Sequence, residues 1–482
     1  MQDQKSSHKP FSKWRRRLLP VHGRELSKFL PLLFMKLLVS FNYTILHSTK
    51  DTLIVTGKGS GAEVIPLLKG GVVLIAAFLF MLIYSRLSNS LTPSKLFYTT
   101  ITPFLIFFAL YGFFLYPNRE WLSPHSSADL ITSYLGESRA HWVVIWRYWM
   151  DSLFFLMAEL WGGVVIALLF WGFANRINTL TEAGRFYPLL SAGGHLGVIA
   201  SGPLLWKVAH WYPADQFAST IQVTMGIATA VTLLIILSYW WIDRNEVSAA
   251  PETKKEKNSL SLHDGLFQVL KSPSLAAIAL MVIGYGLSVN MVEVLWKATL
   301  KQYYPLSKDY QAFMGIVSFA TGLVSLFLAL FVGGNILRKW GWQLSAQLTP
   351  LILGLASVAF LAAYFFGSFF GVASLATLVT IGAIHNVACK SMKYCLFDPT
   401  KEMAYIPLSE DIKVKGKAAV DVVASRFGKS GSSWIQIGLM EALGTSSVLI
   451  TAPYLTPFIL IALIAWSSSI LYLGKSRTQL PA

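Results

Sequence analysis

Charged side chains stand inside stretches of this sequence that are otherwise apolar enough to cross a membrane. Arg147 and Asp151 are four residues apart, and Glu293 and Lys297 repeat that spacing, which brings two side chains onto one face of a helix. A charge at the centre of a membrane helix costs about 2.5 to 3.5 kcal/mol on insertion scales. We therefore expect Arg147 and Asp151 to pair within their helix. We expect Lys297 to reach water from the end of its span, while Glu293 lies deeper.

Other charges in these stretches have no local partner. Glu159 has no opposite charge three or four residues away, so its partner must lie on another helix or on a ligand. Lys390 and Lys393 are one turn apart with no acid between them, and like charges on one helix face repel. Lys69 and Lys429 stand beside glycines in apolar segments. An anionic ligand would compensate these lysines, although Lys69 is equally consistent with a side chain at the membrane interface.

Known nucleotide and metal motifs do not account for these charges. The GKS of Gly428 to Ser430 lacks the glycine that a phosphate-binding loop requires five residues earlier, where Val423 stands. The two cysteines, Cys389 and Cys395, share one apolar segment, and the nine histidines form no HExxH pair. The sequence therefore predicts neither a metal site nor a cofactor.

The composition places these charges in a membrane protein. Of the 482 residues, 54% are hydrophobic and only 13% are charged, which is about half the charged share of a soluble domain. Long apolar runs recur from Phe29 to Leu473, which excludes a soluble enzyme with a single anchor. Stretches that can cross about 30 Å of hydrocarbon predict an all-α protein with about twelve transmembrane helices. They lie near residues 29–46, 64–84, 97–117, 142–174, 187–208 and 220–242, and near 274–295, 311–334, 345–366, 369–393, 418–444 and 448–473.

The predicted spans fall into two groups of six, separated by a polar linker. This pattern resembles major-facilitator-type carriers, whose halves rock around a central site. We expect a basic head at residues 1–28, helical halves at 29–242 and 274–473, a linker at 243–273 and a tail at 474–482. Head, linker and tail are basic and share one face, so the positive-inside rule predicts cytoplasmic termini. The net charge of +16 then reflects topology and anionic lipid, and we expect no nucleic-acid partner.

Seven sequence motifs are spread over the chain: FNYTIL at Phe41, TKDTLIVT at Thr49, GSGAEVIP at Gly59, MAELWG at Met157, LFWGFAN at Leu169, FDPTKEMAYIPL at Phe397 and KVKGKAAVDVV at Lys413. These motifs resemble those of the nucleotide transporter (ATP/ADP translocase) family of chlamydia-like and rickettsial intracellular bacteria and of plastids. The resemblance covers nearly the whole chain and implies a twelve-span carrier for phosphorylated nucleotides. It also implies a dependence on two lysines and two glutamates, which correspond here to Lys69, Glu159, Glu293 and Lys429.

The charged residues within the predicted spans suit two kinds of role. Basic side chains suit phosphate oxygens, whereas acids can hold an empty lysine, orient it or carry a proton. The predicted phosphate-binding residues are Lys69, Lys429, Lys390, Lys393 and Arg147. The predicted coupling or gating residues are Glu159, Glu293, Asp151 and Lys297.

Phosphate contacts cannot distinguish one base from another, so selectivity among nucleotides requires aromatic stacking and a few placed hydrogen bonds. The polar candidates for base recognition on the predicted cavity-lining spans are Asn42, Tyr43, Asn290, His385 and Asn386. The alternative is that these asparagines only join neighbouring helices, as polar residues in membrane proteins often do.

Departures from the family pattern bear on the substrate. The family motif RDTKDTL has His47 and Ser48 in its first two positions here, and FGLGAN in the fifth span is replaced by LSAGGH, which ends at His195. The predicted function is adenine-nucleotide exchange, ATP against ADP, across a bacterial inner membrane by alternating access, with NAD as a further candidate substrate. Two alternatives stay open. One is proton-coupled uptake of nucleoside triphosphates, and the other is a membrane-embedded phosphoryl or nucleotidyl transferase.

Overall fold

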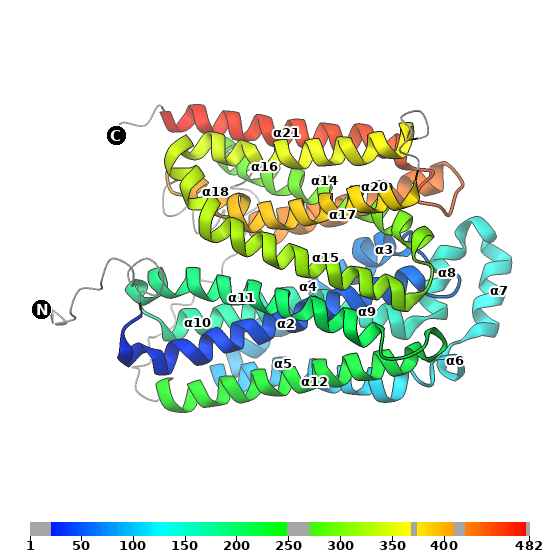
Figure 1. Ribbon diagram of the computed structural model, residues 1–482, viewed down its shortest axis with the longest axis horizontal. Coiled ribbons are helices and arrows are strands. Elements are labelled where there is room, and N and C mark those ends of the chain that lie inside the picture. The colour runs from blue at the N-terminus through cyan, green and yellow to red at the C-terminus, as the bar shows by residue number, and fades with distance from the viewer. Residues whose placement is uncertain (1–20, 248–268, 270, 368–373, 409–419, 479–482) are drawn as a thin grey trace, which may run out of the picture.

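The computed structural model describes residues 21–247, 269, 271–367, 374–408 and 420–478. Most of the predicted basic head (1–28) and linker (243–273) lies outside these residues, as do residues 479–482 of the predicted tail. The described part of the chain is helical and contains no strand, which confirms the all-α prediction. Figure 1 shows long helices that run side by side along the longest axis of the molecule.

The first group of helices ends at residue 242. Its long helices are α2 (Leu26–Thr56), α4 (Val73–Ser90), α5 (Pro93–Leu110), α9 (Trp149–Trp161), α11 (Leu180–Ala209) and α12 (Phe217–Ile242). Shorter helices are α3 (Val64–Leu67), α6 (Arg119–Leu122), α7 (His125–Leu135), α8 (Ala140–Arg147) and α10 (Trp171–Ile177). Three π-helical segments, η2 (Leu68–Val72), η3 (Tyr111–Leu115) and η5 (Gly162–Phe170), continue α3, α5 and α9. The 3-10 turns are η1 (Gly23–Glu25), η4 (Glu137–Arg139) and η6 (Ala214–Gln216), and the π-helical η7 (Asp243–Val247) follows α12.

The second group of helices occupies residues 273–478. It consists of α14 (Pro273–Tyr303), α15 (Ser307–Phe327), α16 (Gly333–Phe366), α17 (Leu375–Met392), α18 (Asp398–Ala404), α20 (Ser425–Ala442) and α21 (Ala452–Thr478). The π-helical segments η8 (Leu328–Val332), η9 (Lys393–Phe397) and η10 (Val420–Ala424) lie before α16, after α17 and before α20.

Ten of the described helices are long and apolar enough to cross a membrane. One of them, Ser307–Phe366, has 60 residues and would extend about 90 Å if it were straight. It changes direction at Gly341, whose φ of 72° lies in the left-handed region that favours glycine, so it supplies two crossings. The segment that contains α20 also has the length of a crossing, but Arg426, Lys429 and Glu441 lower its hydropathy. With these two additions, the architecture has the twelve spans that the sequence predicts.

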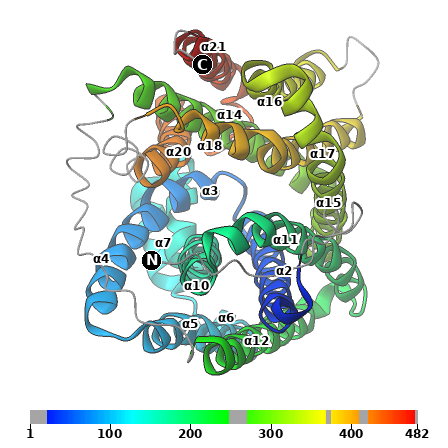
Figure 2. The ribbon, with the colours of Figure 1, turned by 90° about the vertical axis from the view of Figure 1, so that its left-hand side faces the viewer.

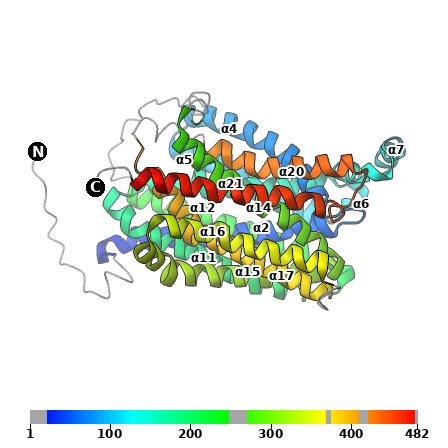
Figure 3. The same ribbon diagram turned by 90° about the horizontal axis from the view of Figure 1, so that it is seen from above.

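The two groups form two bundles, which are seen end on in Figure 2. One hydrophobic core lies within residues 21–242. The other draws mainly on residues 275–473 and also takes in Ile54, Val64 and Phe155 from the first bundle. The start of α2 and the end of α21 lie at one end of the molecule, which we call the terminal face; the opposite end, with α6, α7 and α8, is the loop face (Figures 1 and 3).

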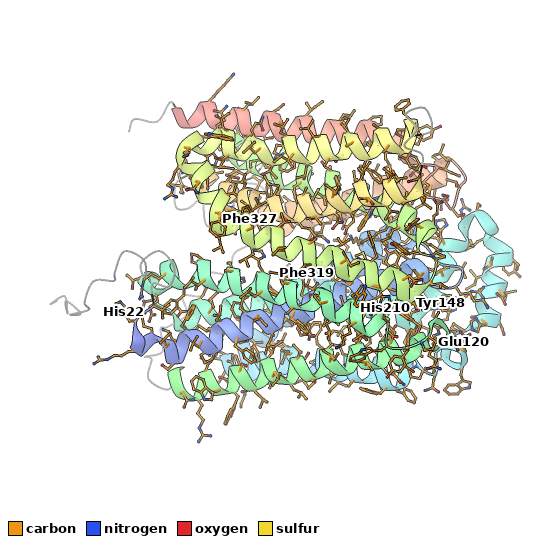
Figure 4. All side chains as sticks on the ribbon, viewed as in Figure 1. His22, Glu120, Tyr148, His210, Phe319 and Phe327 are labelled. Atoms are coloured by element: carbon orange, nitrogen blue, oxygen red, sulfur yellow. The ribbon has the colours of Figure 1, made fainter. Side chains whose placement is uncertain are left out.

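Small residues allow the bundles to approach each other closely. The main contact is between α11 and α15, where a Cβ atom on Gly202 would stand only 2.6 Å from the carbonyl oxygen of Gly315. Phe319 of α15 packs against the same glycine, and Figure 4 shows it at the boundary between the bundles. A second contact joins α3 and η2 to α20. The bundles therefore meet at α11 with α15, at α3 and η2 with α20, and at α2 with α14 and α15. Close backbone packing replaces the hydrophobic effect as the source of attraction between helices in lipid.

Candidate functional site

A cluster of buried acids and bases joins the two bundles where α2, η2, α9, α14 and α17 meet. We call it the charge network, and its members are His47, Lys50, Asp51, Lys69, Glu159, Glu293, Lys297 and Lys390. It lies between the middle of the helices and the loop face, because Lys50 and Lys297 both stand close to the loop-face ends of α2 and α14.

Within the first bundle, Lys50 is the centre of the charge network. Its ammonium lies 2.8 Å from Asp51 Oδ1 and 3.1 Å from Glu159 Oε1. The same ammonium stands 4.1 Å from the centre of the Phe155 ring, which adds a cation–π contact. The His47 imidazole lies between the two carboxylates, 3.5 Å from Asp51 and 3.7 Å from Glu159. Glu159 thus has its partner on another helix, as the sequence predicts.

An ion pair between the bundles closes the charge network. Lys297 Nζ of α14 lies 2.8 Å from Asp51 Oδ2 of α2 and 3.2 Å from Glu293 Oε1, one turn earlier on its own helix. The predicted position of Lys297 at a water-exposed helix end is wrong, because its side chain has no exposed surface. Asp51 draws the lysine inward, where the ion pair with its carboxylate replaces the hydration of the ammonium.

Lys69, which lies on the π-helical turn η2, is also part of the charge network. Its ammonium donates a hydrogen bond to Asn290 Oδ1 at 3.0 Å and lies 3.8 Å from Glu293 Oε2. The alternative that Lys69 reaches water at the membrane interface is wrong, because only 9% of the residue is exposed. The next residue, Gly70, accepts a hydrogen bond from the Trp434 indole of α20 at 3.0 Å through its carbonyl oxygen. The turn therefore presents Lys69 to α14 while its backbone holds α20.

The exposed fraction of the side chains increases along the charge network. The side chains of Lys50, Asp51 and Lys297 are completely buried, whereas those of Glu159, His47 and Lys390 are 12%, 19% and 33% exposed. Lys390 reaches Glu293 Oε1 at 3.9 Å. Lys429 of α20 is exposed, and its charge acts on both Glu159 and Glu293. An anion that enters from the exposed side would meet Lys390 and Lys429 before the buried pairs.

Two predicted site residues lie apart from the charge network. Arg147 binds Asp129 Oδ1 of α7 at 2.5 Å, and Asp151 accepts a hydrogen bond from the Tyr111 hydroxyl at 2.6 Å. The predicted ion pair between Arg147 and Asp151 is therefore wrong. The pair does not form because the helix is interrupted between the two residues: Tyr148 has non-helical backbone angles, which separate α8 from α9. Their predicted roles in phosphate binding and coupling gain no support from these positions.

The predicted base-recognition residues have separate environments. Asn42 donates hydrogen bonds at 3.0 Å to the Ala228 carbonyl and the Thr232 hydroxyl of α12, which joins two helices of one bundle. His385 lies 3.0 Å from the Ser357 hydroxyl, while the neighbouring Asn386 is buried. Tyr43 is half-buried, and its ring contacts that of His47 with centroids 5.3 Å apart. Of this set, Asn290 alone hydrogen-bonds a network lysine among the described residues.

Lys393, which is predicted to bind phosphate, has an acid of its own. Its ammonium lies 2.8 Å from Asp398 Oδ2 and 4.9 Å from the Tyr394 ring centre. Its charge also acts on Lys429, so it lies near the exposed end of the charge network.

Sequence reasoning missed Lys50 and Asp51. The predicted first span ends at residue 46, which leaves both in a loop, whereas α2 continues to Thr56 and makes them intramembrane charges. A Lys-Asp pair followed directly by the apolar residues of TLIV was the signal that could have extended the helix.

Comparisons with known proteins identify the family of this chain. Residues 4–476 match the family described as TLC ATP/ADP transporter. The chain is 42% identical to ADP,ATP carrier protein 1 of Chlamydia pneumoniae, over 98% of this chain and 95% of that protein. It is also 42% identical to the chloroplastic ADP,ATP carrier protein 1 of Arabidopsis thaliana, over 93% of this chain and 74% of that protein.

Solved structures confirm the fold class. A bacterial homologue of the iron transporter ferroportin, in its inward-facing state, superimposes with a TM-score of 0.64 at 14% identity, over 94% of this chain and 99% of that chain. Such structural neighbours are transporters of the major-facilitator type, as the two groups of six predicted spans suggest. The protein is thus a multi-pass membrane transporter, not an enzyme, and it belongs to the TLC ATP/ADP transporter family.

Proposed function

We propose that this transporter exchanges ATP for ADP across a bacterial inner membrane by alternating access. The observation that carries the proposal is the charge network, in which lysines suited to phosphate oxygens are held by acids at the junction of two bundles. The names of the chlamydial and chloroplastic relatives support adenine nucleotides as the substrate. The chlamydial relatives also support a bacterial membrane, and the basic terminal segments support cytoplasmic termini.

Competition between acids and phosphates for the same lysines provides a mechanism. In this structure, Glu293 and Asn290 hold Lys69, and Glu159 holds Lys50. Phosphate oxygens bind ammonium groups at least as well as carboxylates do, so a bound nucleotide would recruit Lys69 and Lys429 and release the acids. Glu293 then loses one cation and attracts Lys297 more strongly, which draws Lys297 away from Asp51 and weakens the inter-bundle pair.

The Asp51–Lys297 pair is suited to act as a gate. It joins the bundles on the loop-face side, where Thr56 also donates a hydrogen bond to Ser307 at 2.8 Å. Because both charges are fully buried, separating them without compensation is costly, and the empty carrier would switch slowly. This property favours exchange over net uptake.

Proton-coupled uptake of nucleoside triphosphates is the second candidate. Its proton site would be Glu159 or Glu293, and the His47 imidazole lies 3.7 Å from Glu159. NAD is a further candidate substrate, since it offers the same phosphate chemistry.

Counterflow in liposomes tests these proposals. Purified protein is reconstituted into vesicles that are preloaded with ADP or left empty, and uptake of labelled ATP, ADP, UTP and NAD is measured. Exchange predicts that internal ADP stimulates ATP uptake strongly. Uptake into empty vesicles that is driven by an imposed pH gradient would support proton coupling and refute strict exchange. Preferred uptake of NAD would refute ATP and ADP as the main substrates.

A further inference from the structure

Lys36 is a buried cation that the charge network does not reach. It is 7% exposed and lies on α2, 14 residues before Lys50, which places it about 21 Å nearer the terminal face. Each lysine of the charge network has an acid within 4 Å. No carboxylate and no hydrogen-bond acceptor contacts the Lys36 ammonium within the part of the chain that the structure describes, so its charge has no anionic partner among those residues.

Aromatic rings surround Lys36 where an acid would be expected. Its Nζ atom lies 5.2 Å from the ring centres of both Phe170 and Trp171, at the junction of η5 and α10. Such cation–π contacts stabilise a buried ammonium only in part, because a ring face carries no net charge. The two rings therefore leave most of the Lys36 charge uncompensated.

The neighbouring backbone leaves room for the Lys36 side chain. At Gly194 of α11, an added Cβ atom would stand 3.0 Å from both Lys36 Cε and the Ser40 hydroxyl. The next residue, His195, places its ring 5.4 Å from that of Tyr394, which belongs to the other bundle. Figure 2, viewed from the terminal face, shows α2, α10 and α11 next to one another in the first bundle. Lys36 thus lies close to the boundary between the bundles.

The face of α2 that carries Lys36 leads to the charge network. Lys36, Ser40, Tyr43, His47 and Lys50 follow one another at intervals of four, three, four and three residues, which is the spacing of a single helix face. A ligand that moves along this face from the terminal face would therefore meet Lys36 first, then Tyr43 and His47, and finally Lys50.

We propose that Lys36, with Phe170, Trp171 and His195 around it, forms a second anion subsite. It holds the phosphate groups of a nucleotide that enters from, or leaves toward, the terminal face. The distance of about 21 Å between Lys36 and Lys50 exceeds the length of a triphosphate chain, so the two subsites are occupied in sequence. This inference rests on the proposed function, because it names the substrate's phosphates as the ligand.

Nucleotide exchange, measured separately at the terminal face and at the loop face, tests the proposed subsite. Both native cysteines are buried, so a cysteine that replaces the exposed Ser133 of α7 can be biotinylated selectively in vesicles whose loop face points outward. Streptavidin then separates the two orientations. We expect Lys36→Gln to raise the KM for nucleotide at the terminal face about tenfold, the usual effect of losing one charge-assisted contact, and to leave the loop-face KM unchanged. Lys36→Arg should retain most of the affinity.

Lys207→Gln is the matched control. Lys207 also stands over a tryptophan, 5.9 Å from the Trp211 ring centre, but near the loop-face end of α11. Its replacement should leave the terminal-face KM unchanged. An equal rise in KM at both faces for Lys36→Gln, or a loss of folded protein in Lys36→Gln and Lys36→Arg alike, would show that Lys36 is structural and overturn the proposal.

Two further measurements distinguish a nucleotide phosphate from a lipid headgroup as the ligand of Lys36. Vesicles of neutral phosphatidylcholine are compared with vesicles that contain anionic lipid. If the effect of Lys36→Gln disappears in the neutral vesicles, a lipid headgroup is the ligand and the proposal fails. Pyrophosphate binding to the purified protein is measured by calorimetry, and Lys36→Gln should weaken it about tenfold. If the wild-type protein exchanges no nucleotide but still shows this Lys36-dependent binding, the proposed function fails and the anion subsite stands.

Discussion

The residues of the charge network differ in which charged groups their replacement leaves without a partner. Lys69 has a neutral partner, Asn290, and a more distant acid, Glu293, so its removal leaves Glu293 still paired with Lys297. We expect Lys69→Gln to fold and to insert, but to weaken nucleotide binding at least tenfold, because one charge-assisted phosphate contact is lost. Equilibrium binding of labelled ADP measures this effect. Lys58→Gln, at an exposed position in the loop after α2, is the charge-matched control and should bind normally.

Asp51 is different, because its removal leaves two buried lysines without their nearest acid. Asp51→Asn should abolish exchange and lower the melting temperature, since breaking a buried ion pair costs about 3 to 5 kcal/mol. The double variant Asp51→Lys with Lys297→Asp restores the inter-bundle pair and should recover part of the exchange rate. A double variant as inactive as Asp51→Lys alone would contradict the gate. Glu182→Gln, which breaks the partly exposed pair with Lys28, should cost no more than about 1 kcal/mol.

Among the helical elements, the π-helical turn η2 carries Lys69, a proposed phosphate ligand, and also contacts α20 of the other bundle. Gly70 lies against α20, where an added Cβ atom would stand 3.0 Å from the Trp434 ring and 3.1 Å from Ser433 Cβ. Gly71, the next residue, has nothing within 4 Å of that position. We expect Gly70→Ala to slow exchange several-fold by pushing η2 from α20. Gly71→Ala should be neutral, or stabilising by up to about 1 kcal/mol. Equal effects of the two substitutions would show that the contact plays no part in transport.

For the molecule as a whole, alternating access requires the loop face to open. The hydroxyls of Thr56 and Ser307 belong to different bundles and are 2.8 Å apart at that face. A disulfide between Thr56→Cys and Ser307→Cys should abolish exchange, and reduction should restore it. The control pair, Ser94→Cys with Asp243→Cys, links neighbouring elements of the first bundle, whose side chains are 2.6 Å apart, and should not block transport. Full exchange with the Thr56–Ser307 disulfide in place would refute opening at this face.

The sequence by itself determined that this is a membrane protein, that it is helical, and which charged residues are costly to insert into the membrane. Hydropathy indicates these features directly. Each membrane-spanning segment must form its backbone hydrogen bonds within its own helix, and each buried charge opposes insertion into the membrane. Glu159, Glu293 and Lys69 could be singled out on that basis alone. The same reasoning failed for Lys50 and Asp51, because polar residues near a helix end lower the local hydropathy and conceal the true end of the span.

Only the tertiary structure decided which charges meet. Helical spacing predicted a pair between Arg147 and Asp151, but a break at Tyr148 turns them toward Asp129 and Tyr111. The contact between Asp51 and Lys297 joins residues 246 positions apart, which no local pattern can indicate. The same holds for Lys36, which lies against the rings of Phe170 and Trp171 with no acid beside it among the described residues. Pairing between helices depends on how two bundles pack, and that packing is set by many small contacts distributed over the whole chain.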